Sequence, residues 1–583
     1  MRRFWLVAVV MLSLAGATPP EAPVADAAMR GDVEAVRSLL QRGGDPNAAQ
    51  GDGMTALHWA AELGDAELAQ VLVDAGAELE PMTRLGSYRP LHIAARNGHV
   101  EVLRVLLEGG ASPSVPTATG SVTPLHFAAT AATPAAVELL LEHGADLDAR
   151  EARWGQTPLM FAAAATRTEV VDLLLARGAN PEVRAFVLDM PTREAEDRAD
   201  QQRREDAQER GAPRASAAGP AHTAPRPAAT PVSSAREPQG EIAPRSYSDA
   251  ELIGGYGGLS ALLMAVREGS VDVAARLLDA GADIDGRSAG DGTTPLLMAT
   301  INGHFDLALE LLARGADPRL LNDAGASALY TTINTQWIPK SRHPQPAHYM
   351  QQHVSYLDLM EALLEAGADP NVRLTKQLWF TTFGGDYLGV DRMGATPFWR
   401  AAYALDVEAM KMLVAYGADP GTPTMKPASR RFRLEPGSDD PTAADPELDP
   451  SGLPPIPTGG PGVYPIHAAA GVGYGEGFAA NIHRHVPDAW MPAIRYLVEE
   501  LGSDVNARDH NGYNAVHHAA ARGDNELILY LVERGADVMA VSRRGQTTVD
   551  MANGPVQRIT PFPETIRLLE SLGAKNNNNC VSC

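Results

Sequence analysis

The chain has 583 residues and a formal net charge of -23, from 49 Lys and Arg against 72 Asp and Glu. Because nucleic acids and anionic lipids attract proteins that neutralise phosphate charge, this balance excludes both as expected partners. Aromatic residues make up only 5% of the chain, and the two cysteines lie at positions 580 and 583, so neither a bulky core nor a disulfide framework is expected.

The N-terminus has the three parts of an export signal in order. Met1-Arg2-Arg3 supplies positive charge, an apolar run extends from Phe4 to Leu14, and Ala15-Gly16-Ala17 provides small residues for cleavage. The apolar run is shorter than the roughly 20 residues that span a bilayer. We therefore expect a signal peptide at residues 1–17, no membrane span after its cleavage, and a periplasmic or secreted mature protein. The sequence leaves the Sec and twin-arginine routes open.

Short phrases that recur along the chain predict pairs of helices. Three of them are Thr55-Ala56-Leu57-His58-Trp59-Ala60-Ala61, Thr123-Pro124-Leu125-His126-Phe127-Ala128-Ala129 and Asn514-Ala515-Val516-His517-His518-Ala519-Ala520. The leading Thr offers an oxygen to the first free amides of a helix, and the Ala pair lets the next copy approach closely. A second helix rich in Leu and Val follows, and a Gly ends it before an Asp-x-Asn turn. Neither helix can bury its apolar face alone, so the copies must stack.

Most copies recur with a period of 33 or 34 residues. The residues at the Leu position of the phrase are Val24, Leu57, Leu91, Leu125, Leu159, Leu262, Leu296, Leu329, Phe398, Ile466, Val516 and Val549. The longer spacings are the period plus inserts. The phrase resembles the T-P-L-H-x-A-A signature of the ankyrin-repeat family, from about residue 24 to 574. The resemblance implies an all-α solenoid of about 12 helix-turn-helix repeats, interrupted by disordered and aromatic-rich insertions and stabilised mainly by contacts between neighbouring repeats.

Histidines hold the fourth position of several copies, at His58, His92, His126 and His467. Since they recur at one repeat position and do not converge on one site, we expect them to fix turns by hydrogen bonding. The copies at Leu329 and Phe398 depart from the signature, which predicts altered local packing there.

Inserts divide the predicted array into blocks. Repeats 1–5 occupy residues 24–185, and the Pro- and Ala-rich residues 186–256 are predicted to be a disordered linker, because they have too little apolar surface to offset the entropy of ordering. Repeats 6–9 occupy residues 257–420 and repeats 10–12 residues 464–574. A Pro-rich acidic loop is predicted between them, at 421–463. The sequence leaves open whether the blocks pack together.

Aromatic residues gather in the second block, chiefly in inserts at about 331–350 and 374–391. A repeat core does not need them there. They could form a recognition surface, or they could pack under the long loops as satellite cores. The residues selected for contact with a protein partner are Trp337, Trp379, Phe380, Tyr387, Trp399, Phe478 and Trp490.

Sites for chemistry are weakly indicated. The run from Gly471 to Gly477 is glycine-rich, but it follows a short helix and lacks a P-loop Lys, so nucleotide binding is not expected. His483 and His485 match no standard metal spacing, which favours a solvated polar loop. Protease and hydrolase motifs are absent from the sequence. We therefore expect no enzymatic activity, no cofactor and no metal.

The tail, residues 575–583, ends in Cys580-Val581-Ser582-Cys583, a C-x-x-C phrase. With a following His it would attach a c-type haem, so a terminal dithiol or disulfide and a truncated haem motif both remain open. The sequence predicts an exported ankyrin-repeat scaffold, expected to be a monomer, that binds an unidentified protein partner. The alternative is a redox or c-type-haem-associated periplasmic protein in which Cys580 and Cys583 are the functional pair.

Overall fold

The computed structural model describes residues 22–209, 247–339, 347–381, 388–428, 449–474, 482–554 and 560–579. The chain divides into two compact units, Met1–Val183 and Arg184–Cys583. Within the described residues both units are built from helix pairs, five in the first and seven in the second. The predicted all-α ankyrin-repeat class is thereby confirmed.

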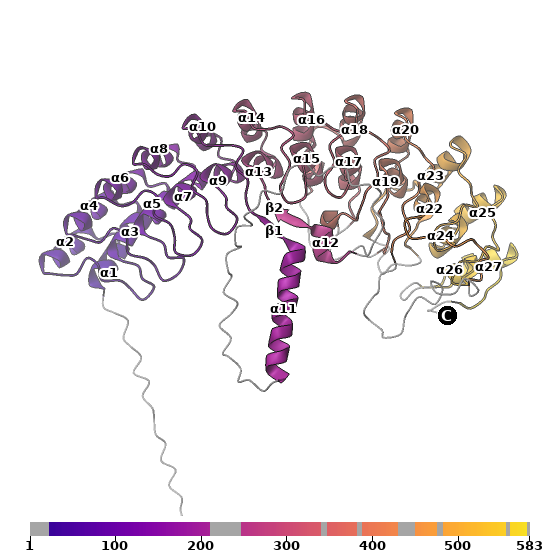
Figure 1. Cartoon of the computed structure of the whole chain (residues 1–583), viewed down its shortest axis with the longest axis horizontal. Coiled ribbons are helices and arrows are strands. Elements are labelled where there is room, and N and C mark those ends of the chain that lie inside the picture. Colours follow the sequence, from indigo (N-terminus) through magenta and orange to yellow (C-terminus); the bar gives the residue numbers. More distant parts are fainter. Residues whose placement is uncertain are drawn as a thin grey trace, which may run out of the picture. The chain divides into compact units, whose positions relative to one another are not determined.

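In the first unit, the first helices of successive repeats pack side by side in one layer and the second helices form another (Figure 1). The first helices are α1 (Pro23–Met29), α3 (Ala56–Leu63), α5 (Pro90–Asn97), α7 (Pro124–Thr130) and α9 (Pro158–Ala164). The second helices are α2 (Val33–Gln41), α4 (Ala66–Asp74), α6 (Val100–Glu108), α8 (Pro134–Glu142) and α10 (Thr168–Ala176). The loops between repeats form fingers beside the first helices.

The second unit repeats this pairing around its inserts. Its first helices are α13 (Ala261–Arg267), α15 (Pro295–Asn302), α17 (Ala328–Gln336), α19 (Pro397–Tyr403), α22 (Pro465–Ala470), α24 (Ala515–Ala521) and α26 (Thr548–Ala552). Its second helices are α14 (Val271–Asp279), α16 (Phe305–Ala313), α18 (Tyr356–Glu365), α20 (Val407–Ala415), α23 (Trp490–Arg495) with the π-helical turn η5 (Tyr496–Glu500), α25 (Asn525–Glu533) and α27 (Pro563–Ser571). Short 3-10 turns lie in two inserts, η1 (His348–Gln351) and η2 (Trp379–Thr381).

Local side chains set the helix ends. Asp65 caps the second helix of its repeat, because its Oδ1 accepts a hydrogen bond from the amide of Leu68 at 2.9 Å. Gly64 ends the first helix with a φ of 73°, in the left-handed region that glycine enters without strain. Thr396 caps α19 in the same way, because its Oγ1 accepts a hydrogen bond from the amide of Trp399 at 3.1 Å.

The Asp-x-Asn turns also join consecutive repeats. Asn47 Oδ1 accepts from the amide of Glu78 at 2.7 Å, one repeat later. Corresponding bonds in the second unit run from the amide of Asp317 to Asp285, of Asp419 to Asn371 and of Asp537 to Asn506. The turn residue therefore satisfies a backbone donor that would otherwise face solvent at the joint.

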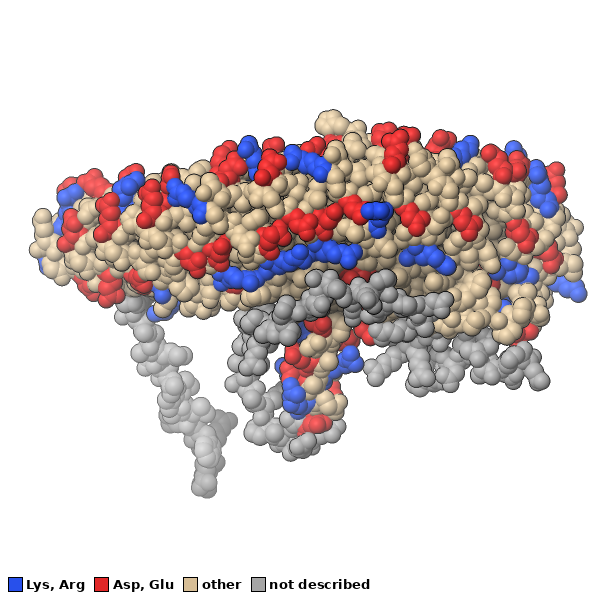
Figure 2. All heavy atoms as spheres, turned by 45° about the horizontal axis from the view of Figure 1, so that its top comes forward, with Lys and Arg blue, Asp and Glu red and all other residues tan. Residues whose placement is uncertain are grey.

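Figure 2 shows charged side chains of both signs on the face that it draws, with acidic and basic side chains gathered in rows between uncharged areas. Several arginines of the second unit bridge the turns. Arg373 Nε donates to Gly394 O at 3.0 Å, and its Nη2 donates to Pro423 O at 2.7 Å. Arg508 makes the equivalent bond to Gly512 O at 2.7 Å. These cations thus bind carbonyls of their own chain.

The predicted disordered linker is wrong at both of its ends. The strand β1 (Val187–Asp189) pairs antiparallel with β2 (Gly255–Gly257), and the helices α11 (Met190–Glu209) and α12 (Asp249–Ile253) adjoin them. Helix α11 carries ion pairs one turn apart, such as Arg193 with Asp197 at 3.2 Å. Such pairs and good helix formers stabilise a helix with little apolar burial. Residues 210–246 lie outside the described part.

The predicted Pro-rich acidic loop at 421–463 is anchored where it is described. Met425 and Pro461 form a bridge between its ends, and Lys426 Nζ donates to Ile456 O at 2.7 Å. Asp449 pairs with Arg543 of a later repeat. Residues 429–448 lie outside the described part.

Candidate protein-interaction surface

The signature histidines lock the joints between repeats, as predicted. His58 Nδ1 accepts from the Thr55 amide at 3.1 Å, and its Nε2 lies 3.0 Å from Tyr88 O of the next repeat. This pairing requires the neutral imidazole with a proton on Nε2. Burial lowers the pKa of all four predicted histidines, to about 4 for His92 and His467. The neutral imidazole rings of these histidines therefore connect neighbouring repeats by hydrogen bonds.

Trp399 occupies the same signature position and performs the same task. Its indole Nε1 donates to Val463 O at 2.9 Å, as His467 Nε2 does to Ala507 O at 2.9 Å. The side chain is 0% exposed and stacks on Tyr403 with a centroid distance of 5.3 Å. The prediction that Trp399 contacts a partner is wrong, because its ring is enclosed in the core.

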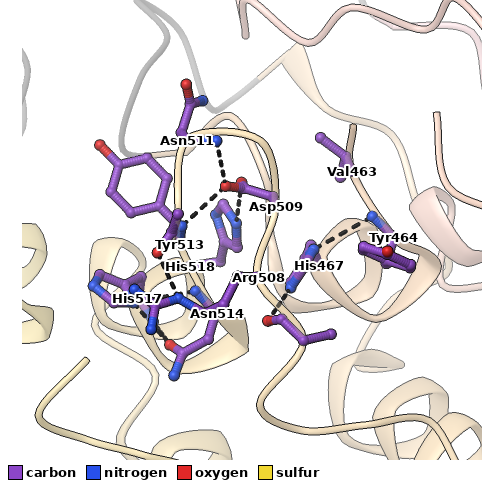
Figure 3. Close-up of polar contacts among 12 residues, drawn as sticks. Val463, Tyr464, His467, Arg508, Asp509, Asn511, Tyr513, Asn514, His517 and His518 are labelled. Carbon is purple, nitrogen blue, oxygen red and sulfur yellow. Dashed lines mark hydrogen bonds and ion pairs between the residues drawn. The ribbon is translucent and has the colours of Figure 1, made fainter. Parts of the chain in front are cut away.

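A more polar joint links α22 to α24, as Figure 3 shows. Asp509 Oδ1 accepts from the amides of Asn511 and Tyr513, both at 2.9 Å, and Oδ2 lies 3.3 Å from His518 Nε2. Although burial opposes it, the contact with His518 holds the pKa of Asp509 below its ordinary value. Asp509 and His518 are each 1% exposed, so this network supports the repeats and is not open to a ligand.

Trp337 packs inside the second unit. Its Nε1 donates to Asp406 Oδ2 at 2.9 Å, and the Tyr356 hydroxyl donates to the same oxygen at 2.7 Å. Asp406 also caps α20 through the amide of Ala409 at 3.1 Å. Trp337 is half-buried, and its ring meets Tyr356 edge-on at 6.2 Å. This arrangement matches the satellite-core alternative.

Trp379 and Phe380 also pack on neighbours. The Trp379 ring meets Tyr256 of β2 at 6.3 Å and Phe380 at 5.9 Å, both edge-on. Phe380 packs against a buried cluster that joins the insert at 374–391 to the first helices of three repeats. The cluster includes Leu374, Leu378, Leu388 and Val390 from the insert and Tyr330, Trp399, Tyr403 and Ala468 from the repeats. The insert therefore covers its own repeats.

Trp490 is covered by an arginine. The Arg522 guanidinium lies 3.2 Å from the Trp490 ring centroid, and His485 contacts the ring at 4.8 Å. His483 is 8% exposed, and its Nε2 lies 2.8 Å from Tyr403 O, so the expected solvated loop is wrong for this residue. Among the described residues, no group of three or more His, Cys, Asp or Glu side chains is placed to hold a metal.

The remaining predicted residues, Tyr387, Phe478, Cys580 and Cys583, lie outside the described part of the chain. The tail is described as far as Asn579. Asp550 Oδ1 accepts from the amides of Asn577 and Asn579, both at 3.2 Å. In the described residues, no helix is both long and apolar enough to cross a membrane.

The first unit carries an aromatic surface that the sequence analysis missed. Trp59, Phe127 and Phe161 directly follow the signature position on α3, α7 and α9, and each is half-buried. Tyr88, at the base of the finger before α5, meets Phe127 edge-on at 5.7 Å. We call these four residues the aromatic row. The signal for it was present, since a bulky ring recurs after the signature position, but repeat positions were interpreted as core.

The first unit also has exposed apolar side chains on its first helices and in one finger. They are Met29 at 44%, Leu63 at 47%, Met82 at 50% and Leu85 at 82% exposure. Met29 and Leu63 end the first helices α1 and α3, whereas Met82 and Leu85 lie in the finger that leads to Tyr88. Arg96, at the end of α5, lies 5.8 Å from the Tyr88 ring centroid. We call this combined surface of first helices and fingers the finger face.

Comparison with known proteins agrees with the fold. A family model described as ankyrin repeats in three copies matches residues 24–117, 115–185, 245–322 and 262–374, and a second ankyrin-repeat model, of many copies, matches residues 497–552. Human BCL-6 corepressor-like protein 1 is 34% identical over 85 residues, 15% of this chain and 4% of that protein. Rat Ankyrin repeat and SAM domain-containing protein 6 is 31% identical over 90 residues, 15% of this chain and 10% of that protein.

The match to these relatives spans only a small share of their length. Among solved structures, the human ASB11 ankyrin repeat domain is 21% identical with a TM-score of 0.35, covering 51% of this chain and 100% of that domain. Together the matches to the ankyrin-repeat models take in more than half of the chain. The chain belongs to the ankyrin-repeat family.

Proposed function

We propose that this protein is a scaffold that binds another protein through the finger face of its first unit. The observation that supports this proposal is the aromatic row, whose four large rings are only half-buried, together with exposed Met82 and Leu85 in the finger before Tyr88. Accessible apolar side chains that recur in neighbouring repeats are a feature expected of an interaction site. Tyr, Trp and Arg are also the residues that contribute most to binding at protein interfaces.

Three repeats of the second unit lack such accessible rings on their first helices. Over the repeats of α17, α19 and α22, residues of the insert at 374–391 already bury Tyr330, Trp399 and Tyr403. The side chains that follow the signature position there are Thr331, Arg400 and Ala468, each at most 1% exposed. The corresponding positions of the first unit therefore present the larger accessible apolar area.

Site-specific cross-linking tests the proposal. A photo-reactive residue in place of Leu85 should cross-link to a partner protein in cells, and the yield should fall at least about tenfold when Tyr88→Ala and Phe127→Ala are added. The matched control places the same group at Tyr416, which is 40% exposed on the second unit. Equal yields at Leu85 with and without the alanine substitutions would contradict the proposal.

We also propose that the protein acts outside the cytoplasm, on the basis of the charged, apolar and small-residue segments of residues 1–17. Mass spectrometry of the N-terminus from the native host should then find a chain that begins at or near Thr18. An N-terminus at Met1 or Arg2 in the mature protein would refute this localisation.

A further inference from the structure

A cavity of about 500 Å³ lies at one joint of the second unit. Its lining comes from the turn after α20, the beginning of α22 and the turn after η5, so it lies where the repeat of α20 meets the repeat of α22. Sites for small molecules have volumes of roughly 300–1,000 Å³. The size of this cavity therefore fits a small molecule.

The turn bond that joins repeats elsewhere is missing at this joint. At the preceding joint Asn371 Oδ1 accepts from the amide of Asp419 at 2.8 Å, and Asn506 makes the same kind of bond at the following one. Gly421 stands at the corresponding position here and has no side-chain acceptor. Within the described part of the chain, the amide of Asp504 consequently has no hydrogen-bond partner. Gly421 and Asp504 both line the cavity, so this donor is available to a ligand.

One additional residue alters the turn after η5. The amide of Ser503 donates to Leu497 O, six residues earlier, at 2.9 Å. In the next repeat the corresponding bond, from the amide of Ala536 to Leu531 O, spans five residues. The π-helical turn η5 accommodates the extra residue, Leu501, which lines the cavity. Single π-helical turns are frequent at functional sites.

Charges of both signs line this cavity. Asp419 and Asp504 supply carboxylates, and Arg508 supplies a guanidinium whose Nε donates to Gly512 O at 2.7 Å. A ligand cation would meet the guanidinium and a ligand anion would meet two carboxylates, whereas a neutral ligand meets no like charge. The lining therefore favours a neutral ligand.

The lining also combines acceptors, a donor and apolar surface. An ionised carboxylate has about four acceptor positions, and Asp504 uses Oδ1 for the amide of Asn506 at 2.8 Å. Tyr464 and Leu501 add an aromatic ring and an aliphatic side chain, both half-buried. A hydroxyl group can donate to a carboxylate and accept from an amide. A sugar carries several hydroxyls around its ring and C–H groups on its faces, so it matches all three features.

We propose that this cavity binds a neutral sugar, whose hydroxyls bond to the carboxylates of Asp419 and Asp504 and to the free amide of Asp504. Its C–H face packs against Tyr464. The proposal goes beyond the scaffold function, because it assigns a small-molecule ligand to the second unit and does not involve the finger face.

Saturation-transfer NMR of the full chain tests the proposal. The probes are glucose, galactose, mannose, N-acetylglucosamine and maltose, each added alone. We expect at least one of them to receive saturation from the protein. Absence of transfer to every one of the five would overturn the proposal.

Gly421→Asn restores the missing turn residue. An added Cβ there would meet only Oδ1 of Asp419, an exposed carboxylate that can shift, at 3.3 Å. The new side chain should accept from the amide of Asp504, and so weaken sugar binding at least about tenfold while the melting temperature stays equal or rises. Gly51→Asn, at an exposed glycine of the first unit with open space around an added Cβ, is the matched control.

Asp504→Asn provides a second variant that leaves the turn position unchanged. It removes one carboxylate charge from the lining and should weaken the same sugar about three- to tenfold. Circular dichroism verifies that each variant is folded. Binding that is equal in the natural chain and in both folded variants would show that the sugar binds elsewhere and would refute the site.

Discussion

At the scale of single residues, the fourth position of the recurring phrase holds different side chains that all connect one repeat to the next. His126 Nε2 lies 3.0 Å from Gln156 O, and Trp399 Nε1 donates to Val463 O at 2.9 Å. Met160, Leu263 and Leu297 stand at the same position and can only pack there. The joint therefore accepts an apolar residue as well as a residue that bridges it by hydrogen bonds.

Acid should weaken the joints that use histidine. Burial holds the pKa of His126 below the 6.5 of an unfolded chain. As the pH falls below 6.5, His126 of the unfolded chain takes up a proton that the folded chain does not. The contribution of neutral His126 to the free energy of unfolding is therefore complete above pH 6.5, and it is lost as the pH falls toward the lower pKa of the folded chain.

The substitution His126→Leu places at this joint a residue that α13 already uses. At pH 7 we expect it to lower the free energy of unfolding by about 1–3 kcal/mol, through the lost hydrogen bonds. The difference from the natural chain should shrink at pH 5. Urea titrations followed by circular dichroism measure both values, with exposed His143→Leu as the control. A difference that stays constant with pH would contradict the assignment.

The buried tryptophan should matter for stability far more than a half-buried one. Trp399→Ala removes a fully enclosed ring and its bond to Val463, at an expected cost of about 3–5 kcal/mol. Trp379→Ala, at a half-buried ring, should cost less than half as much. Equal shifts of the urea midpoint would show that the two rings are similarly enclosed.

At the scale of elements, the sequence period predicts the helix pairs, because capping, alanine contacts and turn glycines act within one repeat. It does not predict the order at Val187–Glu209, because the pairing of β1 with β2 joins residues far from each other in the sequence. The ion pairs of α11 are local, but they lie outside the repeat period. For the insert aromatics the sequence left a recognition surface and satellite cores open. Whether Trp337 faces Asp406 or solvent depends on tertiary packing, which periodicity does not encode.

The turn bonds between repeats predict a local effect. Asn371 accepts from the Asp419 amide at 2.8 Å and donates to Gly417 O at 2.9 Å. Asn371→Ala should therefore destabilise the joint by about 1–2 kcal/mol. Hydrogen exchange should rise in α18 and α20 and stay unchanged in the first unit. Gln201→Ala on exposed α11 is the control, and uniform exchange changes would refute a local joint.

At the scale of the whole molecule, the two units differ in how far their first helices are covered by other segments. The first unit leaves its aromatic row accessible. In the second unit the insert at 374–391 covers α17, α19 and α22, which are the first helices of their repeats. In a repeat array each repeat is stabilised by the segments that pack beside it. For α26 the tail is one of these segments, since Thr547 Oγ1 donates to Lys575 O at 2.8 Å and Asp550 accepts from Asn577 and Asn579.

Removal of residues 575–583 should therefore loosen the last repeat before any other. It takes away the hydrogen bonds that Lys575, Asn577 and Asn579 make with Thr547 and Asp550, among others. Because stability passes only between neighbours, the effect should decline from α27 and α26 toward α24. Hydrogen exchange by mass spectrometry should show at least about tenfold faster exchange in α26 and α27, with the first unit unchanged. The control is the full-length chain with Cys580 and Cys583 replaced by serine. It retains Lys575, Asn577 and Asn579, so its hydrogen exchange should match that of the natural protein. Faster exchange in that control would assign the protection to the cysteines and not to the capping bonds.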